Sequence, residues 1–235
     1  MTIGVLYIAF GKKYIDEAVF SARSLKSVSP KLSITLFTDQ ACSADIFDAV
    51  RLIDVQHKRA KVDYMTDSPY ERTLYLDSDT EVRMDLTEAF EILDRFDIAA
   101  AHSLGRKSPG WARSVPEYND ICYAFPEYNS GVVFYRRSSA CDRLFALWRE
   151  KFYAYQNESN GRDQLSFRIA LWLCDCRIHT LGQEYNVRSA AHRERVEKLR
   201  LKDGLTTLQP RILHWHGLHD KPLVRLASKH RPYKY

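Results

Sequence analysis

The sequence predicts a single α/β domain with a mostly parallel central sheet flanked by helices. Three observations near the start of the chain support this. Residues 2–9 and 32–37 are apolar runs of strand length, and between them apolar side chains recur at helical spacing from Ile15 to Val28. Ser29-Pro30 ends that helix. A strand, helix, strand unit of this kind joins two parallel strands by a right-handed crossover.

The rest of the chain alternates in the same way between short apolar runs and segments of helical spacing or propensity. Asp85 is expected to cap one helix, because a short acidic side chain accepts hydrogen bonds from the free N–H groups of a first turn. Further strands are predicted at 49–55, 74–76, 97–102, 128–135, 177–181 and 211–214. Further helices are predicted at 61–65, 85–93, 138–155, 162–173 and 190–200.

The long segment 103–126 is rich in glycine and proline and is predicted to be a loop. Trp111, Tyr118 and Tyr123 lie within it. Aromatic side chains in so long a loop favour a binding role, for instance against the face of a sugar, and simple packing is the equally weighted alternative.

The composition fits a globular protein with a full core, since 45% of its 235 residues are hydrophobic and 28% are charged. A net charge of +5 suits anionic ligands such as nucleotide phosphates, or an anionic membrane surface. It is too small to indicate nucleic-acid binding, and the sequence has no basic tract or zinc-finger spacing. No secretory signal pattern and no apolar run of about 18 residues is found. Five scattered cysteines fit a reduced, cytoplasmic protein. No second cysteine pair completes a zinc site with Cys174 and Cys176, so structural or incidental roles are expected for these two.

Two carboxylates, Asp77 and Asp79, follow the apolar run 74–76. Residues two apart on an extended chain point to the same side, so both can meet one cation. The carboxyl edge of a sheet is where α/β proteins bind ligands, and oxygen donors suit Mg²⁺ or Mn²⁺ completed by water and phosphate. Taken alone, a D-x-D pair is more often a solvated acidic turn at the end of a strand.

The turn after the first strand is a natural nucleotide site. It has no G-x-G-x-x-G, which argues against a dinucleotide cofactor. Tyr14 lies at this turn, where its ring can stack on a base. Packing of the same ring on the sheet is the alternative.

Together these motifs resemble the retaining glycosyltransferases of family 8, which have the GT-A fold, over roughly residues 3–223. A tyrosine follows the first strand, and Lys61 precedes Asp77 by 16 residues (77 − 61 = 16), where the family has a basic residue facing the donor. The other matches are Y-L-D-x-D-T at 75–80, N-S-G at 129–131, D-Q at 163–164, L-P-x-x-Y-N at 181–186 with Gly182 in the proline place, and H-x-x-G followed by K-P at 214–222.

The resemblance implies transfer of a hexose from a UDP-sugar to a saccharide acceptor, glycan or lipid-linked, with retention. Asp77, Asp79 and His214 would bind one divalent cation, and an imidazole beside carboxylates favours Mn²⁺, with Mg²⁺ as the alternative. This cation and Lys221 would neutralise charge on the leaving nucleoside diphosphate. The implied donor-binding residues are Ala9, Phe10, Tyr14, Lys61, Asp77, Ser78, Asn129, Ser130, Gly131, Gly217 and Lys221.

Asp163 and Gln164 are the catalytic residues that the resemblance implies. Asp163 would hold a sugar hydroxyl or stabilise positive charge at the anomeric carbon, and Gln164 would lie beside it, although an amide is a poor nucleophile. Apart from the resemblance, a simple helix cap is the alternative interpretation of Asp163. His214, beside Trp215, reads more often as a core or surface residue than as a ligand.

The sequence departs from the family pattern near its end and in its first strand. Leu223 stands where the family has a tryptophan, and three residues separate Gly217 from Lys221, one more than usual. The first strand lacks the usual polar residues near Ala9 and Phe10, which weakens the expectation of uracil specificity. We expect the catalytic domain at 1–222. Residues 223–235 form a basic, aromatic tail that either touches an anionic bilayer on the cytoplasmic side or is solvated.

Two other functions are compatible with parts of the sequence. D-S-D-T resembles the nucleophile motif of haloacid-dehalogenase-like phosphatases, but it follows a later strand than in that family and no convincing acidic pair accompanies it. A GT-A-like domain that binds a nucleotide or glycan without transfer is the second. The presence of Asp77, Asp79, His214 and Lys221 argues against it.

Overall fold

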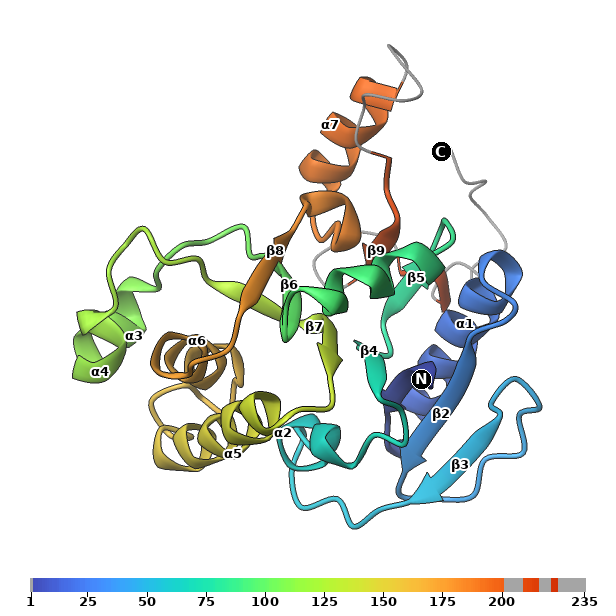
Figure 1. The fold of residues 1–235 in the computed structure, drawn as a ribbon, viewed down its shortest axis with the longest axis horizontal. Helices are drawn as coiled ribbons and strands as arrows, with labels where there is room; N and C mark the ends of the chain where they lie inside the picture. Colours follow the sequence, from blue (N-terminus) through green and yellow to red (C-terminus); the bar gives the residue numbers. More distant parts are fainter. Residues whose placement is uncertain (1, 201–208, 216–220, 224–235) are drawn as a thin grey trace.

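The computed structural model describes residues 2–200, 209–215 and 221–223. A seven-stranded sheet in the order β3-β2-β1-β4-β7-β6-β8 forms its centre (Figure 1). The strands are β1 Ile3–Ile8, β2 Ser33–Thr38, β3 Ala49–Leu52, β4 Arg72–Leu76, β6 Ile98–His102, β7 Tyr128–Arg136 and β8 Ile178–Leu181. Gly217, which was predicted to bind the donor, and the tail from residue 224 lie outside the described residues.

The mostly parallel sheet is confirmed, including the parallel pairing of the first two strands. β1 also runs parallel to β4, and β6 parallel to β8. β7 alone runs against both of its neighbours. Its first residues therefore meet the carboxyl end of β4, and the backbone N–H of Asp77 donates to Gly131 O at 2.8 Å. This reversal places the N-S-G segment beside the D-S-D turn.

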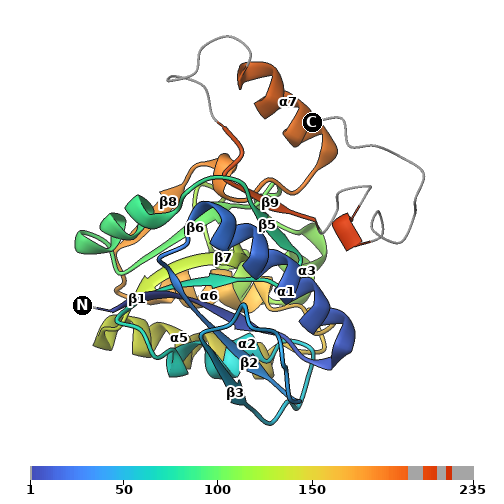
Figure 2. The ribbon, with the colours of Figure 1, turned by 90° about the vertical axis from the view of Figure 1, so that its right-hand side faces the viewer.

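Helices cover both faces of the sheet (Figure 2). On β1, Val5 and Tyr7 face one apolar core, whereas Leu6 and Ile8 face the other. Buried side chains on both faces explain why the strands read as continuous apolar runs. One core is covered by α1 Gly11–Val28 and the 3₁₀ helix η2 Thr87–Asp94, and the other by α2 Lys61–Tyr64, α5 Ser139–Ala154 and α6 Gln164–Leu173.

A second sheet of two short strands brings distant parts of the chain together. β5 Thr80–Val82 pairs antiparallel with β9 Ile212–His214, and Thr80 lies opposite His214. The connection before β9 contains η3 Gln183–Tyr185 and α7 Ala190–Arg200. The sequence did not predict β5, because three residues after an acidic turn carry too little periodicity.

Several predicted elements differ from the observed ones. Segment 103–126 is not a loop throughout, because it contains α3 Pro109–Ser114 and α4 Pro116–Asp120, each starting with a proline whose fixed φ suits a first turn. Helix 85–93 is a 3₁₀ helix, although Asp85 Oδ1 accepts from Thr87 N at 3.0 Å near its start, as a cap does. β3 ends at Leu52. A further 3₁₀ turn, η1 Met65–Asp67, follows α2. No helix within the described ranges is long and apolar enough to cross a bilayer.

Candidate active site

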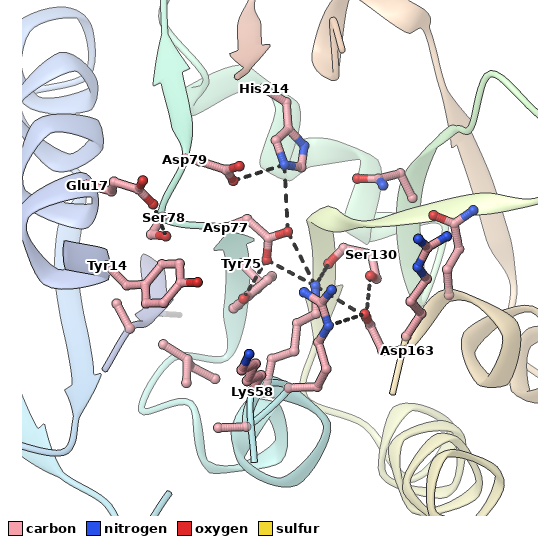
Figure 3. A pocket seen from close by; sticks show the side chains of 18 of the residues that line it. Tyr14, Glu17, Lys58, Tyr75, Asp77, Ser78, Asp79, Ser130, Asp163 and His214 are labelled. Carbon is pink, nitrogen blue, oxygen red and sulfur yellow. Dashed lines mark hydrogen bonds and ion pairs between the residues drawn. The ribbon is translucent and has the colours of Figure 1, made fainter. Parts of the chain in front are cut away.

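A pocket of about 620 Å³ opens where β1 and β4 end and β7 begins. Its size is typical of small-molecule sites. Figure 3 shows the Asp77 carboxylate near its centre, with Tyr14 on one side and Asp163 on the other. All predicted site residues line the pocket except Gly131 and Gly217, and Gly217 lies outside the described residues. The predicted residues in the lining are Ala9, Phe10, Tyr14, Lys61, Asp77, Ser78, Asp79, Asn129, Ser130, Asp163, Gln164, His214 and Lys221.

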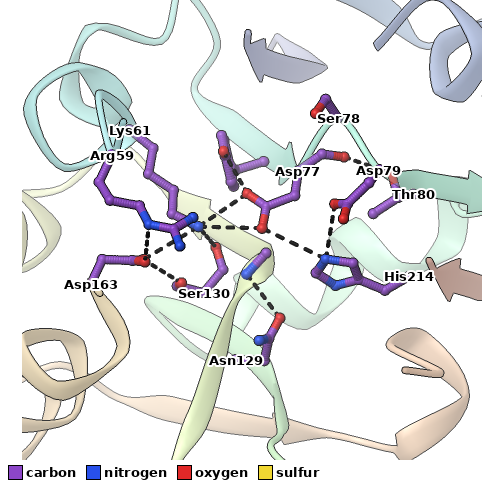
Figure 4. A network of polar contacts seen from close by, with 12 residues as sticks. Arg59, Lys61, Asp77, Ser78, Asp79, Thr80, Asn129, Ser130, Asp163 and His214 are labelled. Atoms are coloured by element: carbon purple, nitrogen blue, oxygen red, sulfur yellow. Dashed lines mark hydrogen bonds and ion pairs between the residues drawn. The ribbon is translucent and has the colours of Figure 1, made fainter. Parts of the chain in front are cut away.

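The three predicted metal ligands converge, although they come from the end of β4, the turn before β5 and the end of β9 (Figure 4). His214 Nε2 lies 3.1 Å from Asp79 Oδ1 and 3.8 Å from Asp77 Oδ2. One ligand atom from each residue falls within 4.8 Å of the others. Two carboxylates and an imidazole at this spacing fit one divalent cation of the Mn²⁺ class.

A chain of amides holds the His214 ring in the orientation that a metal needs. Gly131 N can only donate, and it does so to Asn129 Oδ1 at 3.0 Å, so this oxygen also accepts from Asn186 Nδ2 at 2.7 Å. Asn186 therefore turns its oxygen to His214 Nδ1, at 2.9 Å. Nδ1 therefore donates a hydrogen bond to Asn186 Oδ1, and Nε2 is the ring nitrogen that faces the two carboxylates.

Gly131 packs against the predicted metal ligands Asp77 and His214 and does not line the pocket. A Cβ at this position would come within 2.4 Å of Asp77 Oδ2 and 2.5 Å of His214 Cε1. No side chain fits there while the two ligands keep their places. The N-S-G match thus has a packing reason that the sequence alone does not show.

A buried ion pair lies on the Asp163 side of the pocket. Lys61 Nζ lies 3.0 Å from Asp77 Oδ1, 3.3 Å from Asp163 Oδ2 and 3.2 Å from Ser130 O. Ser130 Oγ donates to Asp163 Oδ2 at 2.5 Å, and Arg59 Nε lies 3.3 Å from Asp163 Oδ1. Lys61 thus links the predicted metal site to Asp163, one of the two predicted catalytic residues.

Asp163 is held ionised in this position. Burial opposes ionisation, but Lys61, Arg59 and the Ser130 hydroxyl outweigh it and keep the pKa of Asp163 below its usual range. Asp163 occupies the N-cap position of α6, yet its side chain makes no capping hydrogen bond. The alternative of a simple cap is therefore wrong, because the carboxylate faces the pocket instead.

Gln164 is oriented by a residue that the sequence did not single out. Its Nε2 donates to the carboxylate of Glu127, which also accepts from the Tyr118 hydroxyl and lies 3.9 Å from Arg168. Glu127 is 4% exposed, and this burial raises its pKa. With its nitrogen on Glu127, Gln164 has its carbonyl oxygen left for a ligand. Only the position before Y-N-S-G distinguishes Glu127 in the sequence.

The first turns of α1 form the opposite wall. Phe10, Lys13, Tyr14 and Glu17 recur at helical spacing and all line the pocket. Tyr14 is 42% exposed, with the ring of Phe10 5.9 Å and Lys13 Nζ 5.5 Å from its own ring, so part of the ring stays open to the pocket. Glu17 was also missed; it is buried and accepts from Ser78 Oγ at 3.2 Å, and burial, then Asp79, raises its pKa.

Segment 103–126 contributes one aromatic residue to the pocket, Trp111 on α3. Tyr118 is fully buried, and Tyr123 is 68% exposed away from the pocket lining. Within this segment the predicted binding role therefore depends on Trp111, whereas Tyr118 packs in the protein interior.

Comparisons with known proteins agree on the fold. No protein-family model matches the chain. No curated protein matches it significantly by sequence. Solved structures do match: the glycosyltransferase GlyE of Streptococcus pneumoniae TIGR4 (TM-score 0.63, 21% identity, 94% of this chain and 56% of that one), and the galactosyltransferase LgtC with donor and acceptor sugar analogues (TM-score 0.61, 14% identity, 91% and 87%).

Mouse xyloside xylosyltransferase 1 is similar as well (TM-score 0.59, 13% identity, 91% of this chain and 97% of that one). The chain spans only 56% of the GlyE structure. At these identities the likeness establishes the fold, which is the GT-A architecture that these glycosyltransferases share.

Proposed function

We propose that the protein is a retaining glycosyltransferase that moves a hexose from a UDP-sugar to a saccharide acceptor with the help of Mn²⁺. The observation that carries the proposal is the meeting of Asp77, Asp79 and His214 at one point of a nucleotide-sized pocket. The GT-A fold of neighbours named as glycosyltransferases supports it. Neither the phosphatase nor the non-catalytic alternative gains support from the pocket.

The residues divide the proposed reaction between two ends of the pocket. Asp77, Asp79 and His214 would hold the cation, which as a Lewis acid helps the nucleoside diphosphate to leave. Lys221 lines the same pocket and adds positive charge for the diphosphate. Tyr14, on the far wall, offers the exposed part of its ring to the base.

At the sugar end, ionised Asp163 supplies a negative charge for the anomeric carbon as positive charge develops there. Lys61 and Ser130 hold both its position and its ionisation. Gln164, turned by Glu127, presents a carbonyl oxygen to the sugar or to the acceptor. Trp111 offers an aromatic face at the same pocket, where the acceptor saccharide can pack.

Calorimetry of UDP binding with and without Mn²⁺ tests the proposal. We expect UDP to bind only with Mn²⁺, and Asp79→Ala to abolish that binding while the fold is kept. Unchanged affinity in Asp79→Ala refutes the metal-dependent site.

Donor hydrolysis tests the reaction itself. UDP-glucose, UDP-galactose and UDP-N-acetylglucosamine are offered with Mn²⁺, and release of UDP from one of them is expected. A phosphatase would instead release phosphate from a generic phosphate ester and prefer Mg²⁺. A lipid-linked acceptor and membrane contact through residues 223–235 stay predictions.

A further inference from the structure

Arg188 lines the pocket but takes no part in the hydrogen bonds and ion pairs described above. Arg188 follows Val187, which forms a parallel bridge with Leu213 in the last strand, and His214 N donates to Val187 O at 2.9 Å. This backbone pairing places Val187 beside the strand that ends at His214. The next residue, Arg188, lines the pocket that contains the three predicted metal ligands.

The guanidinium of Arg188 has no partner within the described part of the chain. Its Nε is buried and makes no hydrogen bond, and the group forms no ion pair there. Lys61 and Arg59, by contrast, already contact Asp163. A guanidinium has five N–H donors in one plane, and burying a donor without an acceptor is unfavourable. Within the described residues Arg188 is therefore left without an acceptor and is open to one from outside them.

The charges around the Arg188 guanidinium indicate what kind of acceptor this is. Burial lowers the pKa of Arg188, and the carboxylates of Asp77, Asp79 and Asp163 offset part of this effect. Arg188 thus faces these carboxylates across the pocket without touching them. A divalent cation on Asp77 and Asp79 would cancel their attraction and repel the guanidinium. An anion at the cation would restore the balance, and the donor's diphosphate is such an anion.

We propose that Arg188 binds the diphosphate of the donor and makes the binding of metal and nucleotide mutually dependent. The inference rests on the proposed function and deepens it. A planar guanidinium pairs with two phosphate oxygens at once, which an ammonium group does not. Arg188 opposes the metal while it is alone and attracts the diphosphate that completes the metal's ligands, so each ligand strengthens the other.

Arg188→Gln separates these two effects because they have opposite signs. Calorimetry with Mn²⁺ alone should give binding about two- to tenfold tighter than wild type, since a repelling charge is gone. With Mn²⁺ saturating, UDP binding should weaken about 10- to 100-fold, the usual loss for a charge-assisted hydrogen bond. UMP has one phosphate and should lose less. Arg188→Lys should bind Mn²⁺ alone like wild type but bind UDP more weakly, because the paired geometry is lost.

The matched control is Arg143→Gln on α5, which removes one exposed positive charge that is not part of the pocket lining. It should change neither titration, and thermal unfolding checks that each variant is folded. The inference about Arg188 is overturned if Arg188→Gln weakens Mn²⁺ binding, or if it binds UDP like wild type. The proposed function still stands in that case, provided that wild-type protein binds UDP in the presence of Mn²⁺. Wild-type protein that does not bind UDP with Mn²⁺ overturns both.

Discussion

Gly131→Ala should disable the metal site while leaving the sheet intact. The added methyl carbon would lie 2.4 Å from Asp77 Oδ2, 2.5 Å from His214 Cε1 and 3.0 Å from Asn129 Oδ1. Ordinary contact between such atoms is about 3.5 Å, so both ligands must move by roughly 1 Å. Metal sites tolerate about 0.2 Å in ligand distance. We therefore expect Mn²⁺ affinity to fall by at least about 100-fold.

The stability cost should be smaller, about 1–3 kcal/mol, because the clashing atoms are side-chain ends that can turn away. Calorimetry measures the Mn²⁺ affinity and chemical denaturation the stability. Gly105→Ala is the matched control, since a Cβ there meets nothing within 4 Å. Gly131→Ala protein that binds Mn²⁺ like wild type would refute the packing argument, because the ligands would then tolerate the displacement.

Three more changes test the rest of the site. Asn186→Leu removes the acceptor that fixes the His214 proton, so Mn²⁺ affinity in calorimetry should fall about 10- to 100-fold, and no loss would contradict the amide chain. Glu127→Ala frees Gln164, so donor-hydrolysis kcat should fall while UDP affinity stays the same; an equal loss of UDP binding would point to general disruption. Because the pKa of Asp163 is lowered in the folded state, its ionised carboxylate stabilises the fold at pH values above the unfolded-state pKa, and this stabilisation is lost as pH falls through the folded-state pKa. In Asp163→Asn, the free energy of unfolding measured with denaturant should therefore fall less steeply with acid than in wild type. An equally steep fall would refute this.

The sequence predicted the parts of the site that follow strands. Asp77 and Asn129 lie at opposite ends of β4 and β7, and the antiparallel pairing of those strands brings them together. Apolar runs mark such strands clearly, so residues next to them are placed once the strand order is known. The strand order itself was not predicted. The resemblance implied that the residues after these strands meet at one donor site, which local periodicity does not.

Other parts of the site had no local signal. Glu127, Glu17 and Arg188 are single charged residues whose place at or beside the pocket depends on tertiary packing. Their local sequence does not predict it, and Glu127 is marked only by its position before Y-N-S-G. β5 is three residues long, and its partner β9 lies far along the chain, so the pairing that delivers His214 is invisible to pattern reasoning. The short helices α3 and α4 were hidden by the prolines that begin them.

A crystal of the protein soaked with Mn²⁺ and UDP tests the central claim most directly, through the anomalous scattering of the metal. The account predicts one manganese peak bonded to Asp77, Asp79 and His214 Nε2, with UDP phosphate oxygens completing its ligands. A manganese peak away from the imidazole, or UDP bound in the pocket with no metal between it and these three side chains, would contradict it.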